Sequence, residues 1–440
     1  MSEIDIHIIG AGIAGLTVAV ELSNAGKTVK LWEASAYAGG RCRSFYDAKL
    51  GMEIDNGNHL LLGVNKSALE LIKKIGSQDQ LYTSSNPSFQ FMDMESKEEW
   101  DIFPGKTFSS RSRVPGASWY SYLRSVCRLV LSKKHAVVSD VLNGSGTQIL
   151  YERLWQPLAV SMLNTPDSLA SARMFRSILY QSFISGYQGL LPYSPLNSWG
   201  KTLIEPALDY ISQRNASIEY KARIKKISVT DGYVSHIVMA DREVPILPNQ
   251  HVILAVPQRE YIRLMPNLNE EEGIKESSDK EAELVTHQEK VLETHAIVNV
   301  HFSCQAKSDT YHKEVPFMGI VGGTAEWLFF RSDLISSTTS AADDLAKKGD
   351  EIIAEAVWKD VCLQQGWNSD RPLPPYRVIR EKQATFSCSP ENIALRATVH
   401  TQICNLKIAG DHTQTGLPAT IEGAVQSGNA AASAVMAMKL

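Results

Sequence analysis

A glycine pattern near the start of the chain constrains the fold most strongly. Residues 4–9 form a β-branched apolar run typical of a buried strand, and Gly10, Gly12 and Gly15 follow with the spacing G-x-G-x-x-G. Residues 16–25 then show a helical pattern. These glycines permit a tight turn, close approach of the backbone to a pyrophosphate, and close packing of helix on strand. The order predicts a Rossmann-type dinucleotide site.

A second strand, predicted over residues 28–32, ends at Glu33. This acid follows the glycines by about twenty residues, the spacing at which it accepts a hydrogen bond from a ribose hydroxyl. Ile13 and Ala14 in the glycine turn, and Ala34 after the acid, are assigned to the same nucleotide site. The alternative is a glycine-rich turn that binds nothing.

A second glycine pair, Gly39 and Gly40, precedes Arg41. The pair allows another close approach of backbone to cofactor, and the arginine can reach a phosphate or the edge of a flavin. A nicotinamide dinucleotide has no obvious use for this pair, whereas a larger, extended dinucleotide does.

The sequence then carries a turn signal at Asn56-Gly57, followed by Asn58 and His59. On composition alone, His59 beside a run of leucines is more typical of a buried structural histidine than of a catalytic one.

Composition excludes several other classes of protein. The 440 residues are enough for about two domains, and a net charge of −4 gives no electrostatic case for nucleic-acid binding. The six cysteines are scattered without a C-x-x-C, which predicts neither a metal site nor a disulfide framework and fits a reducing cytoplasm. The chain starts almost directly with a strand, so we expect no signal peptide, and no apolar run reaches the length of about 18 residues that a bilayer span requires.

The last motif lies near the C-terminus. A strand over residues 406–411 runs into Gly410 and Asp411, and residues Leu417, Pro418, Ala419 and Thr420 precede the final helix. Between the two ends we expect strands over residues 80–104, a loop over residues 190–195 and a strand pair over residues 218–232.

These segments together resemble a known family. G-A-G-I-A-G, Glu33, G-G-R, I-D-N-G and A-G-D are similar to the signatures of the amine oxidase and phytoene desaturase-like flavoproteins. D-N-G-N-H-L-L-L-G, L-N-T-P, E-K-Q-A-T-F and T-G-L-P-A-T-I-E-G-A resemble one branch, the hydroxysqualene dehydroxylases of squalene and hopanoid biosynthesis. The chain departs from that branch at Asn58, where glutamine is usual, at His412, where an aromatic residue is common, and at Trp199-Gly200-Lys201, where a glycine pair is usual.

The resemblance implies FAD as the cofactor. Asp411 would then contact the ribityl chain or the pyrophosphate, the helix after Thr420 would direct its N-terminus at the flavin, and the backbone of Ile224 would contact the adenine. The implied fold class is α/β: a Rossmann-type FAD-binding domain with an inserted mixed-sheet substrate domain and a helical segment. We assign residues 1–80, 213–265 and 396–440 to the FAD-binding domain, and residues 81–212 and 266–395 to the substrate domain.

Residues 118–135 predict an amphipathic helix with apolar and aromatic residues at helical spacing and a flank of four cations. Such a helix suits contact with a membrane surface. The alternative is a helix that packs its apolar side on the protein and solvates its charges.

No Ser/His/Asp arrangement, carboxylate pair or metal-ligand cluster stands out, so the chemistry is expected to be that of the flavin. The resemblance implies reduction of hydroxysqualene to squalene with loss of water, and His59 is the candidate acid for the departing hydroxyl. An amine oxidase, a carotenoid-type desaturase and a non-enzymatic flavin scaffold are the alternatives. The electron donor is open, because no second nicotinamide motif is present.

Overall fold

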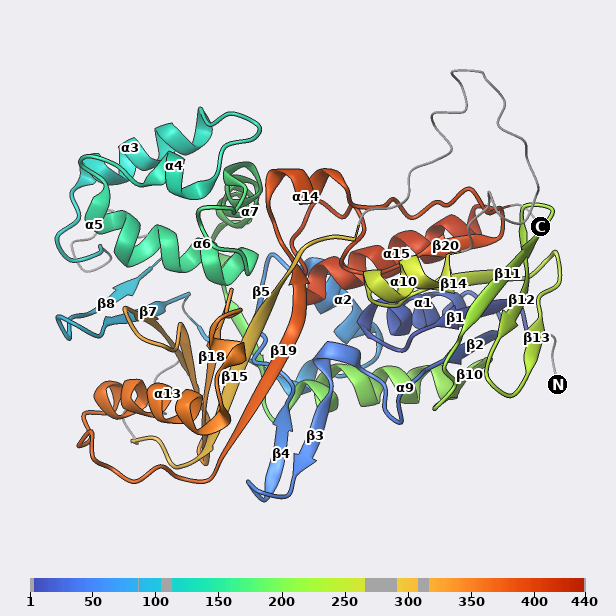
Figure 1. Ribbon diagram of the computed structural model, residues 1–440, viewed down its shortest axis with the longest axis horizontal. Coiled ribbons are helices and arrows are strands. Elements are labelled where there is room, and N and C mark those ends of the chain that lie inside the picture. The colour runs from blue at the N-terminus through green and yellow to red at the C-terminus, as the bar shows by residue number, and fades with distance from the viewer. Residues whose placement is uncertain (1–3, 86, 104–112, 266–290, 308–315, 439–440) are drawn as a thin grey trace.

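The computed structural model describes residues 4–85, 87–103, 113–265, 291–307 and 316–438. It has two lobes (Figure 1), one built on a parallel sheet and one on a mainly antiparallel sheet with a group of helices above it.

The parallel sheet has five strands in the order β10-β2-β1-β14-β20. The strands are β1 (Ile6–Ile9), β2 (Val29–Trp32), β10 (Ala216–Glu219), β14 (His251–Leu254) and β20 (Leu406–Ile408). All four residues of β1 are buried, as expected for a central parallel strand covered on both faces. The strands come from the beginning, middle and end of the chain, so the two ends of the chain meet in this sheet.

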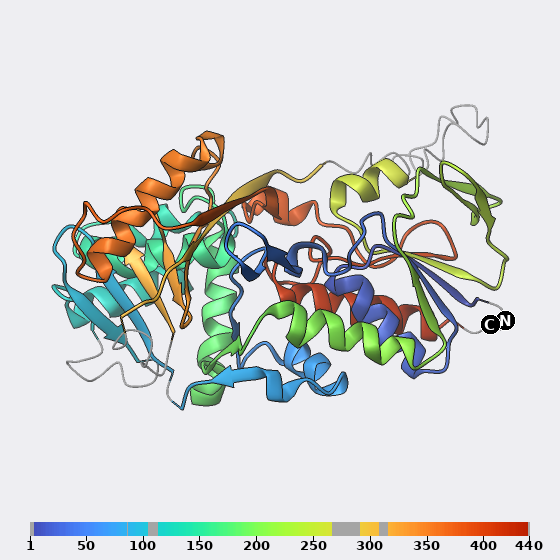
Figure 2. The same ribbon diagram turned by 90° about the horizontal axis from the view of Figure 1, so that it is seen from below.

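Helices cover one face of this sheet (Figure 2): α1 (Ile13–Asn24), α9 (Glu205–Ser212) and α15 (Ile421–Met436), with α2 (Lys66–Lys74) against α15. Gly428 lets α1 and α15 approach closely, because a Cβ atom there would lie 2.8 Å from the carbonyl oxygen of Ala14. On the other face lie a three-stranded sheet of β11 (Lys226–Thr230), β12 (Tyr233–Val238) and β13 (Glu243–Pro245), and helix α10 (Gln258–Leu264).

The second lobe contains a seven-stranded sheet in the order β19-β15-β18-β17-β16-β7-β8, which we call the substrate sheet. Two long strands, β15 and β19, run from this lobe towards the lobe of the parallel sheet (Figure 1). Its strands are β7 (Phe89–Asp93), β8 (Glu99–Ile102), β15 (Thr294–Ser303), β16 (Phe317–Val321), β17 (Trp327–Phe330), β18 (Leu334–Thr339) and β19 (Tyr376–Phe386), and α13 (Asp350–Gln364) packs beside it.

The remaining elements complete the two lobes. The helical group comprises α3 (Trp119–Val130), α4 (Val138–Leu142), α5 (Gln148–Leu150), α6 (Gln156–Leu163), α7 (Ala172–Ile184) and α8 (Gly186–Gly189). A hairpin is formed by β3 (Ser44–Asp47) and β4 (Met52–Asp55), a small sheet by β5 (Leu61–Leu62), β9 (Pro192–Pro195) and β6 (Leu81–Thr83), and α14 (Pro390–Ala394) precedes the C-terminal segment. Among the described residues, no helix is both long enough and apolar enough to cross a membrane.

Three local predictions differ from the structure because partners distant in sequence decide them. The prediction of a loop over residues 190–195 is wrong: β9 forms there, with Pro192 and Pro195 at its ends, where a missing N–H matters least. The strands expected over residues 80–104 divide between two sheets. The pair expected over residues 218–232 is also divided, since β10 joins the parallel sheet and β11 does not.

Candidate functional site

The glycine turn between β1 and α1 has the geometry that a dinucleotide requires. A Cβ atom at Gly15 would lie 2.0 Å from the carbonyl oxygen of Gly10, and Gly10 itself has a φ of +102°. A Cβ atom at Gly12, by contrast, would meet nothing within 4 Å. Gly10 and Gly15 therefore serve the turn itself, whereas Gly12 faces open space at the N-terminus of α1. The side chains of Ile13 and Ala14 are buried in the first turn of that helix.

Glu33 supports the same turn. One of its carboxylate oxygens accepts a hydrogen bond from the backbone N–H of Ala11, and the other accepts one from Ser35, both at 2.8 Å. The segment that contains Ile224 lies beside this acid, because the N–H of Ala222 donates to the carbonyl oxygen of Glu33 at 2.9 Å. Ile224 is buried, and Ala34 is exposed.

The second glycine pair packs onto the first. The N–H of Gly39 donates to the carbonyl oxygen of Ala11 at 2.8 Å, and a Cβ atom at Gly40 would lie 3.4 Å from the Cα atom of Gly12. Gly39 and Gly40 both have positive φ angles, +104° and +56°, which favour glycine. The two glycine segments thus form one continuous surface of backbone.

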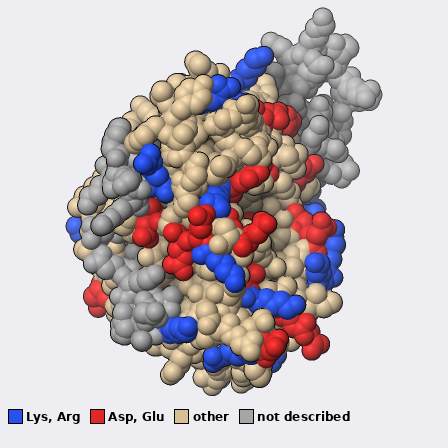
Figure 3. Space-filling view, turned by 90° about the vertical axis from the view of Figure 1, so that its left-hand side faces the viewer, with Lys and Arg blue, Asp and Glu red and all other residues tan. Residues whose placement is uncertain are grey.

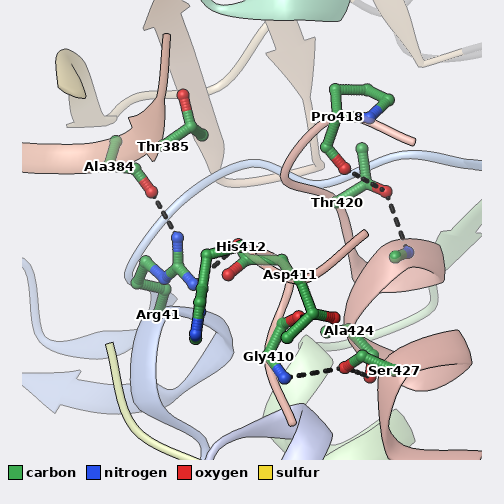
Figure 4. A network of polar contacts seen from close by, with 12 residues as sticks. Arg41, Ala384, Thr385, Gly410, Asp411, His412, Pro418, Thr420, Ala424 and Ser427 are labelled. Carbon is green, nitrogen blue, oxygen red and sulfur yellow. Dashed lines mark hydrogen bonds and ion pairs between the residues drawn. The ribbon is translucent and has the colours of Figure 1, made fainter. Parts of the chain in front are cut away.

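Arg41 connects this surface to the C-terminal motif (Figure 4). Its guanidinium lies 2.7 Å from the carboxylate of Asp411 and also donates to the carbonyl oxygen of Ala384 on β19. Burial opposes ionisation of Asp411, but the Arg41 guanidinium outweighs burial and holds the pKa of Asp411 below its ordinary value. Residues 41, 384 and 411 come from three distant segments, and only the tertiary fold brings them together.

The turn at Asn56-Gly57-Asn58 is tied to the substrate sheet. The side-chain amide of Asn58 donates to the hydroxyl of Thr338 at 3.1 Å, and that hydroxyl donates to the side chain of Asn299 at 2.8 Å. Asn299 donates in turn to the carbonyl oxygen of Asn56 at 3.5 Å. The side chain of Asn58 therefore contacts the sheet, and its assignment to the cofactor stays a prediction. Sequence patterns could not indicate Asn299, because it lies within an ordinary strand.

His59 lies directly after this turn, half-buried. Its carbonyl oxygen accepts from the indole N–H of Trp199, and the two rings meet edge to face with 6.5 Å between their centroids. The Nε2 atom of His59 has no hydrogen-bond partner in the part of the chain that the structure describes. Burial lowers the pKa of His59 to about 4, so its imidazole is neutral at neutral pH.

The C-terminal motif ends in a helix N-terminus. Gly410 donates its N–H to the hydroxyl of Ser427 at 2.8 Å, and Thr420 caps α15 by accepting from the N–H of Gly423 at 3.1 Å. The peptide dipoles of a helix this long place a partial positive charge at its N-terminus. Residues 417–420 therefore present a positively polarised edge. Ala419 in this segment packs against the apolar cluster of the second lobe, which includes Trp155, Phe386, Met162 and Trp327.

Arg396 was not indicated by any sequence motif, yet it contacts the C-terminal loop more extensively than any residue that was. It is 3% exposed, and its guanidinium donates to the carbonyl oxygens of Asp411 at 2.9 Å, Leu417 at 2.8 Å and His412 at 3.3 Å. An isolated arginine between two motifs carries no signal that sequence reasoning could use.

The arrangement fits an extended dinucleotide carrying a flavin. Four features between β1 and α15 suit such a cofactor. They are the open space at Gly12, the two packed glycine segments, the pair of Arg41 with the buried Asp411, and the N-terminus of α15. Among the described residues there is no group of three or more His, Cys, Asp or Glu side chains that could hold a metal ion. The groups present can bind and polarise a cofactor, and the redox chemistry would be that of the cofactor.

Comparison with known proteins agrees with this geometry. The family model described as flavin containing amine oxidoreductase matches residues 13–436. Hydroxysqualene dehydroxylase from Sinorhizobium fredii is 34% identical over 434 residues, which cover 97% of this chain and 97% of that protein. The enzyme of the same name from Zymomonas mobilis is 34% identical over 432 residues, with the same coverage. Zeta-carotene desaturase from a Synechocystis species is 22% identical over 493 residues, covering 98% and 97%.

Solved structures show the same fold. Cyclohexylamine oxidase from Brevibacterium oxydans superimposes with a TM-score of 0.71 at 14% identity, covering 99% of each chain. Putrescine oxidase bound to putrescine superimposes with a TM-score of 0.68 at 14% identity, again over 99% of each chain. At this identity the likeness concerns the fold, and the Rossmann-type α/β architecture with an inserted substrate domain is confirmed.

Proposed function

Because this chain belongs to the flavin-containing amine oxidoreductases and, within them, to the hydroxysqualene dehydroxylases, we propose that it reduces hydroxysqualene to squalene with loss of water. The observation that carries this proposal is 34% identity to enzymes of that name along 97% of the chain. The carotenoid desaturases are more distant relatives, at 22% identity.

FAD would be held by the backbone of the two glycine segments, by Glu33 and Ile224 at its adenosine end, and by Asp411 and residues 417–420 towards its flavin end. When reduced, it supplies the hydride that replaces the hydroxyl group. Glu33 has further acceptor capacity after its two backbone hydrogen bonds, because a carboxylate offers about four lone-pair sites. The donor that reduces the flavin is unassigned.

The surroundings of Ala419 support an apolar substrate. Ala419, in the segment over residues 417–420, packs against one apolar cluster together with Trp155, Phe386, Met162 and Trp327. An isoprenoid chain gains free energy on leaving water in proportion to its buried apolar area, at about 25 cal/mol per Å². We place the hydrocarbon chain against this cluster, and these side chains would exclude water from the reacting carbon.

His59 is the proposed donor to the departing hydroxyl. Its Nε2 atom is unsatisfied among the described residues, whereas the ring also makes a hydrogen bond to the backbone of Arg41. Because a pKa of about 4 leaves the imidazole neutral at neutral pH, His59 would have to take up a proton when substrate is bound before it passes that proton to the departing hydroxyl.

The test is anaerobic incubation of the FAD-loaded, chemically reduced enzyme with hydroxysqualene, followed by chromatography of the extracted lipid. We expect squalene to form in proportion to the reoxidised flavin. Flavin that stays reduced, with hydroxysqualene recovered unchanged, would contradict the proposal. Parallel incubations of the oxidised enzyme with phytoene and with a primary amine test the desaturase and amine oxidase alternatives.

We further propose that α3 contacts a membrane surface, where such a lipid would be collected. Its inward face is formed by Ser121, Ser125 and Leu129. Its outward face is apolar, with exposed fractions of 64% at Leu123 and 58% at Val130. The alternative of an apolar side packed on the protein therefore does not describe this helix. The other exposed apolar residues of this surface are Trp119, Tyr120, Val126 and Leu131, with Tyr180 and Ile184 on α7.

Basic side chains next to the outward face of α3 support a membrane as its partner. Lys133 and Lys134 are exposed just beyond the end of α3, and each basic residue near an anionic surface contributes about 1 kcal/mol. In Figure 3 most charged side chains gather in the middle of this end of the molecule, and its upper part, at the height of α3, is mostly uncharged apart from a group of Lys and Arg side chains near the top. The site of action would be the cytoplasmic face of a membrane.

Co-sedimentation with anionic vesicles of phosphatidylglycerol and phosphatidylcholine tests this contact. The double variant Leu123→Asp/Val130→Asp should lower the bound fraction at least about fivefold, because two charges enter the apolar face. Ile352→Asp is the matched control, since Ile352 is 58% exposed on α13, away from α3. A wild-type protein that stays in the supernatant would refute membrane contact without affecting the proposed reaction.

A further inference from the structure

Arg396 is buried among the residues of the loop over residues 411–417. Besides the carbonyl oxygens of Asp411, His412 and Leu417, its guanidinium donates to the carbonyl oxygen of Thr413 and, at 3.0 Å, to the hydroxyl of Thr415. The loop over residues 411–417, which we call the flavin loop, is thus wrapped around one side chain. Gln414 adds to this contact, since its side-chain amide donates to the carbonyl oxygen of Arg396 at 2.6 Å.

In the part of the chain that the structure describes, no carboxylate forms an ion pair with Arg396. The nearest acid in the loop, Asp411, offers Arg396 its backbone carbonyl and directs its carboxylate to Arg41. Burial lowers the pKa of Arg396 to about 10, which still leaves it protonated at neutral pH. A buried charge without a counter-ion is expensive unless many dipoles compensate it, and here the backbone carbonyls of the flavin loop do so.

The guanidinium also contacts the substrate side of the molecule. It lies over the ring of Phe386 with 4.5 Å to the ring centroid, within the range of a cation–π interaction. Phe386 ends β19, the strand whose Ala384 accepts a hydrogen bond from Arg41, and it belongs to the apolar cluster that contains Ala419. One side chain therefore touches both the flavin loop and the wall assigned to the substrate.

We propose that Arg396 is a positioning residue for the cofactor: it sets the shape of the flavin loop, and through Phe386 it couples that loop to the substrate sheet. This inference rests on the proposed FAD site. It goes beyond the motif residues, because Arg396 acts through the carbonyl groups of residues 411, 412, 413 and 417 and through the hydroxyl of Thr415. Its planar fork can serve several carbonyl groups at once, which the single ammonium group of a lysine cannot reproduce.

The experiment compares Arg396→Lys, Arg396→Gln and wild-type enzyme. The apoproteins are titrated with FAD by flavin fluorescence, the release rate of bound FAD is measured, and visible circular dichroism reports the environment of the flavin. Arg214→Lys is the matched control: its guanidinium stacks over Tyr210 with 3.4 Å to the ring centroid and donates to the carbonyl oxygen of Tyr210, a residue of α9.

We expect Arg396→Gln to weaken FAD binding by at least about tenfold, to speed FAD release and to change the visible circular dichroism. Arg396→Lys should fall between this variant and wild type, and Arg214→Lys should behave as wild type. Phe386→Leu, which removes the ring but retains an apolar side chain, should raise the KM for hydroxysqualene and speed FAD release by about threefold.

FAD affinity within twofold of wild type in a folded Arg396→Gln protein, with unchanged circular dichroism, overturns the proposal. If Arg396→Gln does not fold, the same criterion applied to Arg396→Lys decides. A variant apoprotein that loses stability while keeping wild-type FAD affinity also overturns it, since the role would then be structural only. Failure of wild-type protein to bind FAD at all would instead remove the proposed function.

Discussion

At the scale of single residues, one histidine and three glycines decide different properties of the site. His59 is neutral and unsatisfied at Nε2 among the described residues, while its carbonyl oxygen is held by Trp199. Gly10 and Gly15 serve the backbone turn, and Gly12 serves the space in front of it. We therefore predict that single substitutions at these positions separate FAD binding and turnover from folding.

Replacing His59 with Phe should lower the turnover of hydroxysqualene by about 10²- to 10⁴-fold, the usual contribution of a general acid, while FAD affinity stays within a few-fold. Single-turnover reoxidation of the reduced flavin measures this step directly. His400→Asn, at an exposed histidine, serves as control. Turnover of the His59 variant within a few-fold of wild type would remove this residue from the proton-donor role.

Replacement by alanine should have opposite effects on stability at Gly15 and at Gly12. Gly15→Ala should lower the free energy of unfolding of the apoprotein by about 1–3 kcal/mol, because the new methyl group would meet the carbonyl oxygen of Gly10 at 2.0 Å. Gly12→Ala should leave that free energy within about 0.5 kcal/mol, since Gly12 has an ordinary φ of −74° and its Cβ position is open.

The readouts for this pair are urea unfolding of the apoproteins and FAD titration. FAD affinity should fall at least about tenfold for Gly12→Ala, because its methyl group would occupy the space in front of the helix N-terminus. Wild-type affinity in that variant would show that the pyrophosphate does not approach there.

At the scale of elements, a carboxylate joins α15, which packs on α1, to α2, which packs on α15. Glu422, in the first turn of α15, accepts from the backbone N–H groups of Ser67 at 3.2 Å and Ala68 at 2.8 Å. It thereby caps the start of α2, whose first N–H groups have no partners within the helix. This contact holds α15 in place, the helix whose positively polarised N-terminus we propose to face the cofactor.

Glu422→Ala should lower the free energy of unfolding by about 1–3 kcal/mol, because the half-buried N–H of Ser67 and the buried N–H of Ala68 lose their acceptor and Glu422 is only 4% exposed. The control is Glu70→Ala, at an exposed acid on the outside of α2, for which we expect a change within about 0.5 kcal/mol. Urea unfolding at pH 7 measures both. Equal stability of the two variants would show that the contact between α2 and α15 contributes little.

At the scale of the whole molecule, three buried histidines and the half-buried His59 are neutral at neutral pH. Burial lowers the pKa of His7, His59, His301 and His412 to about 4, from an ordinary value near 6.5. The unfolded chain therefore binds more protons than the folded protein between about pH 6.5 and pH 4. The stability that these groups contribute is complete above pH 6.5 and is lost as the pH falls through this range.

When the pH falls from 7 to 5, protonation of each of these histidines in the unfolded chain should lower the free energy of unfolding by roughly 1–2 kcal/mol. Urea unfolding at the two pH values measures the sum. His301→Phe should reduce the difference, because the side chain of His301 is 1% exposed and burial lowers its pKa to about 4. Stability that is constant or rises on acidification to pH 5 would contradict the assignment of neutral buried histidines.

The sequence alone determined the cofactor lobe and its family. Glycine spacing, the position of Glu33 and the A-G-D strand end encode backbone geometry over a few residues, so they can be recognised without the fold. The prediction of FAD is confirmed by the family to which the chain belongs. The five-segment division into domains and the individual cofactor contacts stay predictions.

The tertiary structure decided what depends on partners distant in sequence. Arg396 and Asn299 matter because of where the chain folds back on them, and neither lies in a recognisable pattern. The sequence of α3 has the same helical periodicity whether its apolar face packs on the protein or faces outward. The periodicity therefore could not show that Ser121 and Ser125 pack inside. A short-range pattern specifies local backbone geometry, whereas a contact across the chain depends on packing that no local pattern contains.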